Sequence, residues 1–82
     1  MNWFVYIVEC SDNSLYTGIT TNIQRRVKEH NNRIGAKSLK CKLPVKVVYS
    51  EKYYNQRQAA KREKEIKGWC RNKKLSLIKH SP

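Results

Sequence analysis

Five side chains in this sequence are of types that together can cut a phosphodiester bond. An arginine can grip a phosphate through its planar bidentate fork. One carboxylate can hold a hard divalent cation such as Mg²⁺ together with phosphate oxygens and water, and tyrosine or histidine can take part in proton transfer. Facing one site in a basic protein, such groups are typical of phosphodiester cleavage. The five candidates are Tyr6, Tyr16, Arg26, His30 and Glu63.

Short strands and helices must position these side chains. Runs of β-branched and aromatic residues predict strands, and the patterns Thr21-x-x-Gln24 and Asn55-x-x-Gln58 resemble capping boxes that open helices. The order β-β-α-β-α-α predicts an α+β fold in which helices flank a small three-stranded antiparallel sheet, as one domain over residues 1–82. The predicted strands are Trp3–Val8, Leu15–Thr20 and Val45–Tyr49, and the predicted helices are residues 21–31, Asn55–Gly68 and Arg71–Lys79.

The two candidate tyrosines belong to the first two strands, which predict a hairpin. With a loop over residues 11–13, Tyr6 lies opposite Gly18, and Tyr16 lies diagonally from Tyr6 on the same sheet face. A glycine opposite a tyrosine leaves room above the strand for a ligand or another backbone. The alternative is that the two tyrosines are ordinary core and edge aromatics.

The first helix directs a cation and a histidine toward the sheet. At about 100° per residue, Ile23 and Val27 define the buried stripe, and Arg26 and His30 fall on the same side. A buried unpaired charge is costly, so the guanidinium needs a partner. A bound phosphate would supply one, and an ordinary ion pair or a snorkelling side chain is the alternative.

The second helix carries a carboxylate on its inward face. Ala59, Ile66 and Cys70 share one side of the predicted helix, and Glu63 lies in the middle of that side. Glu63 is one of only 6 acidic residues in the chain, so its inward position is unexpected. It can be a salt-bridge partner of Arg26 or a ligand for a divalent cation.

The charge balance predicts a polyanionic partner. The chain has 18 Lys and Arg against 6 Asp and Glu, a net charge of +12, and a pI of about 10.0. Such a surface most often binds nucleic acid, the alternative being a ribosomal-protein-like or merely soluble basic surface. No stretch is apolar enough to span a bilayer and no signal-peptide pattern opens the chain, so we expect a cytoplasmic protein.

The cysteines favour reduced thiols. Cys10, Cys41 and Cys70 are far apart, odd in number and form no C-x-x-C pair. This spacing argues against a disulfide framework. A zinc cluster with His30 or His80 is the alternative.

The candidate residues also form a recurring set of motifs. Val5-Tyr6-Ile7 is followed nine residues on by Tyr16-Thr17-Gly18, then by Arg26, His30 and Ala60-x-x-Glu63. This combination resembles the GIY-YIG nuclease superfamily, and more narrowly its small stand-alone bacterial members, over Trp3 to about Ile78. The chain departs from the superfamily by having Val5 in place of the first glycine, and from the stand-alone members by having Ser38-Leu39 where they have Tyr-Thr.

The resemblance implies a DNA nuclease that uses a single Mg²⁺ or Mn²⁺ ion. It implies that Tyr6 or Tyr16 assists deprotonation of the attacking water, that Arg26 steadies the charge on the scissile phosphate, and that Glu63 holds the metal. His30 would hydrogen-bond within the site or help the proton transfer. Since a tyrosine has an ordinary pKa of about 10, we expect Arg26, the metal and the positive field to favour the phenolate. Which tyrosine is the base stays open.

Further residues complete the expected DNA-binding surface. Phosphate contacts give affinity and salt dependence without sequence information, although a solvated surface is the alternative for each lysine. Trp69 is interpreted as a core residue, with base stacking as the alternative. Asn72 is the candidate for an asparagine that many members of the superfamily carry after the glutamate. The predicted phosphate-binding residues are Lys37, Lys40, Lys42, Arg57, Lys61, Lys64 and Arg71.

The sequence therefore predicts a divalent-metal-dependent DNA endonuclease. We expect it to be structure-selective or only weakly sequence-specific, with a role in DNA repair or recombination. A protein partner could supply substrate targeting, and no membrane association is expected. The alternatives are a non-catalytic basic nucleic-acid-binding module with the same fold, and an RNA-binding or RNA-processing protein.

Overall fold

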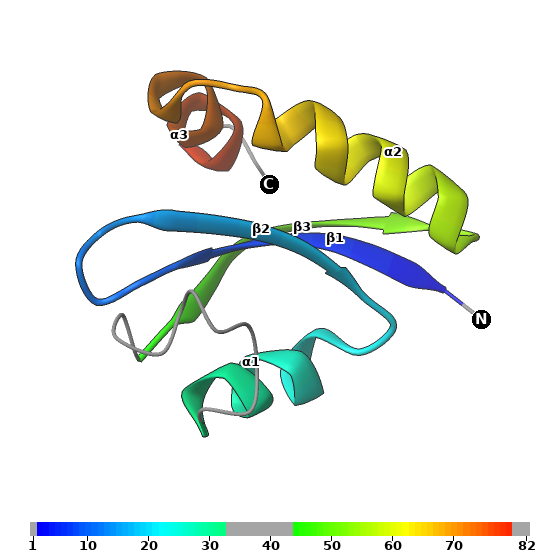
Figure 1. Ribbon diagram of the computed structural model, residues 1–82, viewed down its shortest axis with the longest axis horizontal. Coiled ribbons are helices and arrows are strands. Elements are labelled where there is room, and N and C mark those ends of the chain that lie inside the picture. Colours follow the sequence, from blue (N-terminus) through cyan, green and yellow to red (C-terminus); the bar gives the residue numbers. More distant parts are fainter. Residues whose placement is uncertain (1, 33–43, 80–82) are drawn as a thin grey trace.

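A three-stranded antiparallel sheet separates one helix from two others (Figure 1). The computed structural model describes residues 2–32 and 44–79. Figure 1 shows α1 below the sheet and both α2 and α3 above it. The predicted fold class and element order are confirmed, and the third strand is longer than predicted. The strands are β1 (Trp3–Glu9), β2 (Leu15–Thr20) and β3 (Lys46–Tyr53), and the helices are α1 (Ile23–Asn31), α2 (Gln56–Lys67) and α3 (Arg71–Lys79).

The central strand is β1, and the sheet order is β2-β1-β3. The backbone N–H of Cys10 donates to the carbonyl oxygen of Ser14 over 2.8 Å, so the hairpin loop covers the predicted residues. Asn13 takes the left-handed conformation in this loop with a φ of 69°, which asparagine tolerates better than most residues. The resulting register pairs Tyr6 with Gly18, as predicted.

Two apolar clusters lie on opposite faces of the sheet because side chains alternate along a strand. On the α1 side, the buried side chains of Tyr6 and Val8 pack with the half-buried Ile23 and Val27. On the other side, Val5 and Ile7 pack with two fully buried residues of α2, and half-buried side chains of α3 pack against the same cluster. The strand β1 is therefore buried on both faces, as predicted. The α2 residues of this second cluster are Ala59 and Ile66.

Asparagine caps begin both α1 and α2. The Asn22 side chain accepts a hydrogen bond from the Arg25 backbone N–H over 3.0 Å, so the prediction that Thr21 opens the first helix was wrong by one residue. Asparagine is a stronger cap than threonine. The Asn55 side chain accepts from the Gln58 N–H over 2.9 Å, as predicted. None of the described helices is both long and apolar enough to cross a membrane.

Candidate active site

A buried hydrogen bond between Tyr6 and His30 is the centre of the candidate site. Each of these two residues is only 1% exposed, and the Tyr6 hydroxyl lies 3.1 Å from Nε2 of His30. Tyr6 comes from the central strand and His30 from the last turn of α1. The packing of Ile23 and Val27 against the sheet brings the α1 face that carries His30 onto the tyrosine.

Tyr16 contacts the same histidine from the edge strand. Its ring meets the His30 ring edge-on, with centroids 5.7 Å apart and an interplanar angle of 73°. Tyr16 is half-buried, whereas Tyr6 is enclosed. The histidine therefore lies against both tyrosines, and only Tyr16 has substantial contact with solvent.

Gly18 provides the space that the Tyr6 side chain fills. A Cβ at Gly18 would lie 2.7 Å from the Tyr6 hydroxyl oxygen and 2.8 Å from its Cζ, distances that real Cβ atoms do not tolerate. We predicted that this glycine leaves room for a ligand or another backbone. That prediction was wrong, because the rotamer of Tyr6 turns its own ring into the gap over β2.

Arg26 lies beside Tyr6 at the border of the site. Its side chain is 33% exposed, and Nη1 donates to Oε1 of Glu29 over 3.1 Å. The guanidinium is also near enough to the Tyr6 hydroxyl to act on its pKa, which it lowers. The predicted ion pair of Arg26 therefore exists, with Glu29 as the partner, while a third of the side chain stays open to an incoming anion.

Glu63 approaches the tyrosines from the other side of the sheet. It lies on α2, which packs against β1 and β2, and its side chain is 23% exposed. Among the described residues its ion-pair partner is Lys67, whose Nζ lies 3.7 Å from Oε1, and not Arg26, which was one of the predicted alternatives. The same Nζ lies 5.9 Å from the ring centroid of Tyr16. Lys67 thus connects the glutamate to the tyrosine across the sheet edge, a contact that sequence reasoning missed.

The inward face of α2 is shorter than we predicted. Ala59 and Ile66 are fully buried, but Cys70 is exposed, because the helix ends at Lys67 and its C-cap is Gly68. The prediction that Cys70 shares the buried face was therefore wrong. Both Cys10 and Cys70 are free thiols, as expected, and Cys41 lies outside the described residues.

The electrostatics keep Tyr6 and His30 neutral near pH 7. Burial raises the pKa of Tyr6 above its ordinary 10.0, and the nearby Tyr16 and Glu63 add to this, while Arg26 opposes it. Burial and the charge of Arg26 lower the pKa of His30 below 6.5, with Glu29 opposing. Arg26 favours the Tyr6 phenolate, as we expected, but loss of hydration outweighs it and the net pKa of Tyr6 is raised. The expected contribution of a metal ion stays a prediction.

The donor set suits a metal that keeps most of its water. Among the described residues there is no group of three or more His, Cys, Asp and Glu side chains that could enclose a metal ion, so this part of the chain offers no zinc cluster. Glu63 is a single, partly exposed carboxylate whose ion-pair partner, Lys67, lies 5.9 Å from the Tyr16 ring centroid. Mg²⁺ is usually held by one or two carboxylates together with water and phosphate, and Glu63 fits that mode of binding.

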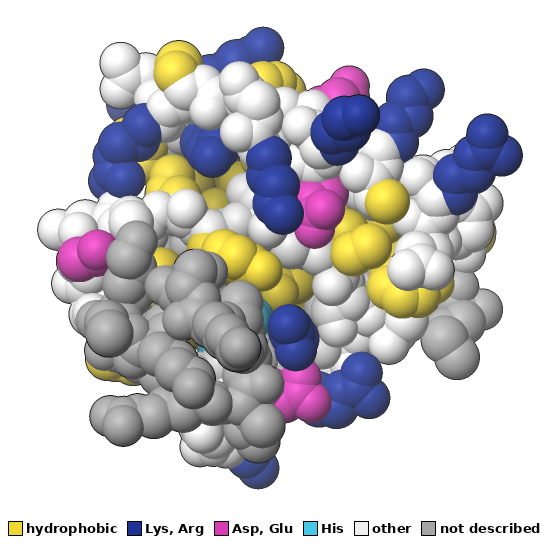
Figure 2. All heavy atoms as spheres, in the orientation of Figure 1, with side chains coloured by type: hydrophobic (Ala, Val, Ile, Leu, Met, Phe, Trp, Pro, Cys, Tyr) yellow, Lys and Arg dark blue, Asp and Glu magenta, His cyan; other side chains and the backbone are white. Residues whose placement is uncertain are grey.

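The predicted phosphate-binding residues of the helices are all exposed: Arg57, Lys61, Lys64 and Arg71. Figure 2 shows Lys and Arg side chains distributed widely over the displayed face. Asn72 is also exposed, in the first turn of α3. The other three predicted phosphate-binding residues, Lys37, Lys40 and Lys42, lie outside the described residues.

Trp69 packs in the core between α2 and α3, as interpreted. It is half-buried against the second apolar cluster. Two cations also cover its ring, with Cζ of Arg62 at 5.0 Å and Nζ of Lys73 at 4.4 Å from the centroid. The ring is therefore engaged within the protein, which supports its interpretation as a core residue.

A second polar cluster, also missed from the sequence, ties β3 to α2. The Glu51 carboxylate accepts hydrogen bonds from the hydroxyls of Tyr49 and Tyr53 and forms a bidentate pair with Arg62, at 3.0 and 3.2 Å. Burial acts to raise the pKa of Glu51, but the bonds from Arg62 and the two tyrosines outweigh it and lower that pKa. Burial and the carboxylate raise the pKa of both tyrosines to about 12. Tyr49, Glu51 and Tyr53 alternate along β3 and therefore share one face of the strand. This spacing is the feature of the sequence from which the cluster could have been predicted.

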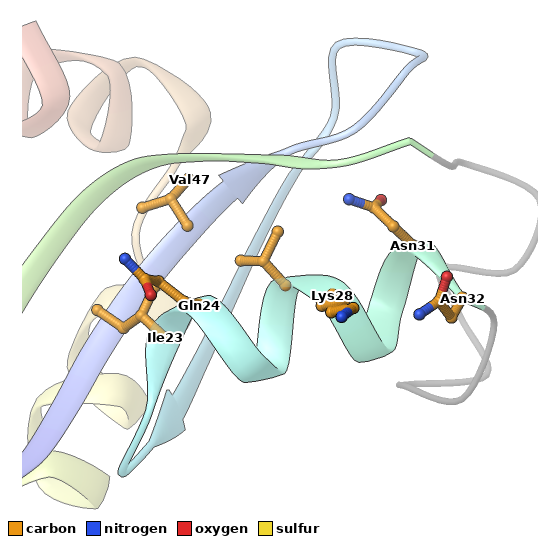
Figure 3. Close-up of a pocket in the computed structure, with 7 residues that line it drawn as sticks. Ile23, Gln24, Lys28, Asn31, Asn32 and Val47 are labelled. Carbon is orange, nitrogen blue, oxygen red and sulfur yellow. The ribbon is translucent and has the colours of Figure 1, made fainter.

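A groove of about 520 Å³ separates α1 from β3 (Figure 3). None of the five predicted site residues lines it, so the groove is not where the candidate chemistry takes place. Its lining comprises Ile23, Gln24, Val27, Lys28, Asn31, Asn32 and Val47.

The fold and the site together define a GIY-YIG domain. The GIY-YIG catalytic domain family matches residues 2–76, and the chain belongs to this family. The chain is 54% identical over 76 residues to a UPF0213 protein of Staphylococcus aureus, with 93% of each chain covered. These comparisons confirm the predicted resemblance to small bacterial members.

Two solution NMR structures resemble the present one. The UPF0213 protein BH0048 from Bacillus halodurans shares 39% identity with a TM-score of 0.62, and the protein EF2693 from E. faecalis shares 33% identity with a TM-score of 0.65. Each alignment covers 96% of this chain and 84% of the other. The names of these relatives state no activity.

Proposed function

We propose that this protein is a divalent-metal-dependent DNA endonuclease that hydrolyses phosphodiester bonds. The observation that carries the proposal is the convergence of Tyr6 and Tyr16 on the same histidine, His30, with Arg26 near Tyr6. Glu63 is close enough to influence the pKa of Tyr6 from the other side of the sheet. A cation, a carboxylate and proton-carrying groups around one edge strand suit attack on a phosphodiester.

The burial and contacts of the two tyrosines suit different tasks. Tyr6 is buried and hydrogen-bonded to Nε2 of His30 over 3.1 Å, and the Arg26 guanidinium is near enough to lower its pKa. Tyr6 is thereby a positioning residue that fixes the histidine and the guanidinium. Tyr16 is the tyrosine with access to solvent, and we assign it the contact with the attacking water.

Arg26 and Glu63 act on the reacting phosphate. Arg26 donates to phosphate oxygens as negative charge develops in the transition state, which a preorganised cation stabilises. Glu63 would hold one Mg²⁺ or Mn²⁺, and the bound ion would lower the pKa of its water and polarise the phosphate.

The exposed cations of α2 and α3 support a substrate read mainly through its backbone. Arg57, Lys61, Lys64 and Arg71 can each neutralise a phosphate. Because phosphate contacts carry no base information, we propose selection by DNA structure, or weak sequence preference, as in repair or recombination. The proposed location is the cytoplasm, where a protein partner could supply targeting.

A cleavage assay tests this function. Labelled single-stranded, duplex, flap and four-way-junction DNA would be incubated with Mg²⁺, Mn²⁺ or EDTA. Glu63→Gln and Arg26→Met proteins would run beside the wild type. Lys52→Met, which removes one exposed positive charge on β3, controls for charge loss and for contaminating nucleases.

Cutting that needs metal, persists in Lys52→Met and falls at least about 100-fold in the two site variants would establish the enzyme, since one oxyanion-stabilising group contributes about 10²–10³ in rate. Equal DNA binding by all the proteins without any cutting would favour the non-catalytic binding module. Tight cutting at one duplex sequence would contradict structure selection.

A further inference from the structure

Lys67 occupies a position that the proposed mechanism does not yet use. It lies one turn after Glu63 on α2, with Nζ 3.7 Å from the Glu63 carboxylate and 5.9 Å from the Tyr16 ring centroid. Its side chain is 51% exposed, so half of it is free to rearrange. The ammonium therefore lies near both the proposed metal ligand and the solvent-accessible tyrosine.

This ammonium and a divalent cation compete for one carboxylate. Charges of the same sign within a few ångströms repel strongly unless water separates them, so Nζ would have to leave its present position if Glu63 held a metal ion. A lysine stem has four flexible carbons, and the exposure of Lys67 lets the head group move without unpacking the helix. The displaced ammonium needs another anion.

The substrate phosphate is the anion that the geometry offers. Arg26 on α1 and Lys67 on α2 lie on opposite sides of the sheet, and each reaches one of the two site tyrosines. Each is paired in the free protein with a glutamate of its own helix, Glu29 or Glu63. A phosphate beside Tyr16 would be flanked by two cations that arrive from opposite faces.

We propose that Lys67 is a second phosphate-binding cation of this site, which neutralises Glu63 in the metal-free protein and transfers to the substrate phosphate when the metal binds. The inference rests on the proposed function, because it assumes that Glu63 holds the metal. The proposal adds Lys67 to the site as a positioning cation. It also implies an order of events, in which the Lys67–Glu63 ion pair would break when the metal and the DNA bind.

Two binding measurements test the role of Lys67 without relying on cleavage. The first is the dissociation constant for Mn²⁺ in the absence of DNA, from electron paramagnetic resonance titration of the free ion. The second is the salt dependence of binding to labelled single-stranded DNA in Ca²⁺, from fluorescence anisotropy. Wild type, Lys67→Met, Lys67→Arg and Glu63→Gln are compared, with Lys52→Met on β3 as the matched charge control.

We expect Lys67→Met to bind Mn²⁺ about two- to fivefold more tightly, the range that a partly exposed ion pair supports. Its slope of log affinity against log salt should become shallower by about 0.7, the loss of one phosphate contact on a single strand. Lys67→Arg should restore the slope, and Lys52→Met should match the wild type in both measurements.

The outcomes separate this inference from the function on which it rests. Agreement of Lys67→Met with the wild type in either measurement overturns the proposed role of Lys67. If Glu63→Gln at the same time loses Mn²⁺ binding, the metal site and the proposed nuclease stand. If Glu63→Gln binds Mn²⁺ as the wild type does, Glu63 is not the metal ligand, and both proposals fall.

Discussion

Replacing Gly18 by alanine should displace Tyr6 from its hydrogen bond with His30. The added Cβ would lie 2.7 Å from the Tyr6 hydroxyl oxygen, 2.8 Å from Cζ and 3.2 Å from Cε1. The rigid ring has nowhere to move, because Tyr6 is 1% exposed and packs with Val8 in the first apolar cluster. Either the ring or the β2 backbone must shift.

The expected loss in the free energy of unfolding of Gly18→Ala has three contributions. Overpacking a well-packed core costs about 1–3 kcal/mol, and the loss of the Tyr6–His30 hydrogen bond costs about 0.5–1.5 kcal/mol. Alanine regains about 0.4–1 kcal/mol by restricting the unfolded chain, since no described glycine has a positive φ. The free energy of unfolding should therefore fall by about 0.5–4 kcal/mol, and Tm should fall by about 4–8 °C for each kcal/mol lost.

Urea unfolding followed by circular dichroism measures this change, with Gly68→Ala as the matched control. At Gly68 the nearest atom to an added Cβ is the Glu65 carbonyl oxygen at 3.4 Å, and φ and ψ are −78° and −7°. That conformation suits alanine, so the control should be neutral or stabilised by up to about 1 kcal/mol.

A double-mutant cycle isolates the contact with Tyr6. Leucine at position 6 lacks the hydroxyl and the Cζ atom, so in a Tyr6→Leu background Gly18→Ala should cost less than about 1 kcal/mol. The coupling between the two positions should exceed about 1 kcal/mol. If Gly18→Ala is as stable as the wild type, or equally costly in both backgrounds, the steric argument is refuted.

Three further predictions concern the ionisable groups. The imidazole of His30 should titrate below pH 6.5 by NMR because burial and Arg26 lower its pKa, and a value above 6.5 would contradict the assigned neutral histidine. The pKa of Glu51 is lowered from 4.5 in the folded state, so its stabilisation is present above about pH 4.5 and is lost as the pH falls through the folded pKa. The free energy of unfolding of Glu51→Gln, measured by urea titration, should therefore fall less between pH 6 and pH 3 than that of the wild type. Equal losses in the two proteins would argue against a lowered pKa of Glu51. Arg62→Met leaves the largely buried Glu51 carboxylate without its cation, which should lower the free energy of unfolding by about 1–3 kcal/mol; a change below about 0.5 kcal/mol would show that the two tyrosine hydroxyls suffice.

Local rules of the chain account for most of the fold. The turn residues and the β-branched runs were enough to predict the hairpin and the pairing of Tyr6 with Gly18, because a short loop leaves few registers. The α2 cap at Asn55 followed from a similarly local pattern. Thr21 was mistaken for the α1 cap because Asn22, the next residue, can make the same hydrogen bond.

The face of each site residue could also be predicted from periodicity. From the helical spacing we predicted that Arg26 and His30 lie on the side of α1 that meets the sheet, and that Glu63 faces inward on α2. Periodicity stops being informative where an element ends, which is why Cys70 was wrongly placed on the buried face of α2.

Other features depended on how the elements pack on one another. The ring of Tyr6 fills the space over Gly18 because of its rotamer, and Lys67 reaches Tyr16 because α2 lies against β2. The pairing of Glu51 with Arg62 joins a strand to a helix that follows it. No spacing along the chain specifies such contacts, since they depend on the angle and the height at which a helix crosses the sheet.

The sequence by itself determined the elements, their order, the hairpin register and the residue types that carry the chemistry, because these depend on neighbours in the chain. Tertiary structure alone decided which charges pair and how far each group is dehydrated. The direction of the Tyr6 pKa shows the difference: the nearby positive charge suggested a lower value, and burial between sheet and helix raised it. Burial is a property of the packed molecule, so only the folded arrangement could reveal it.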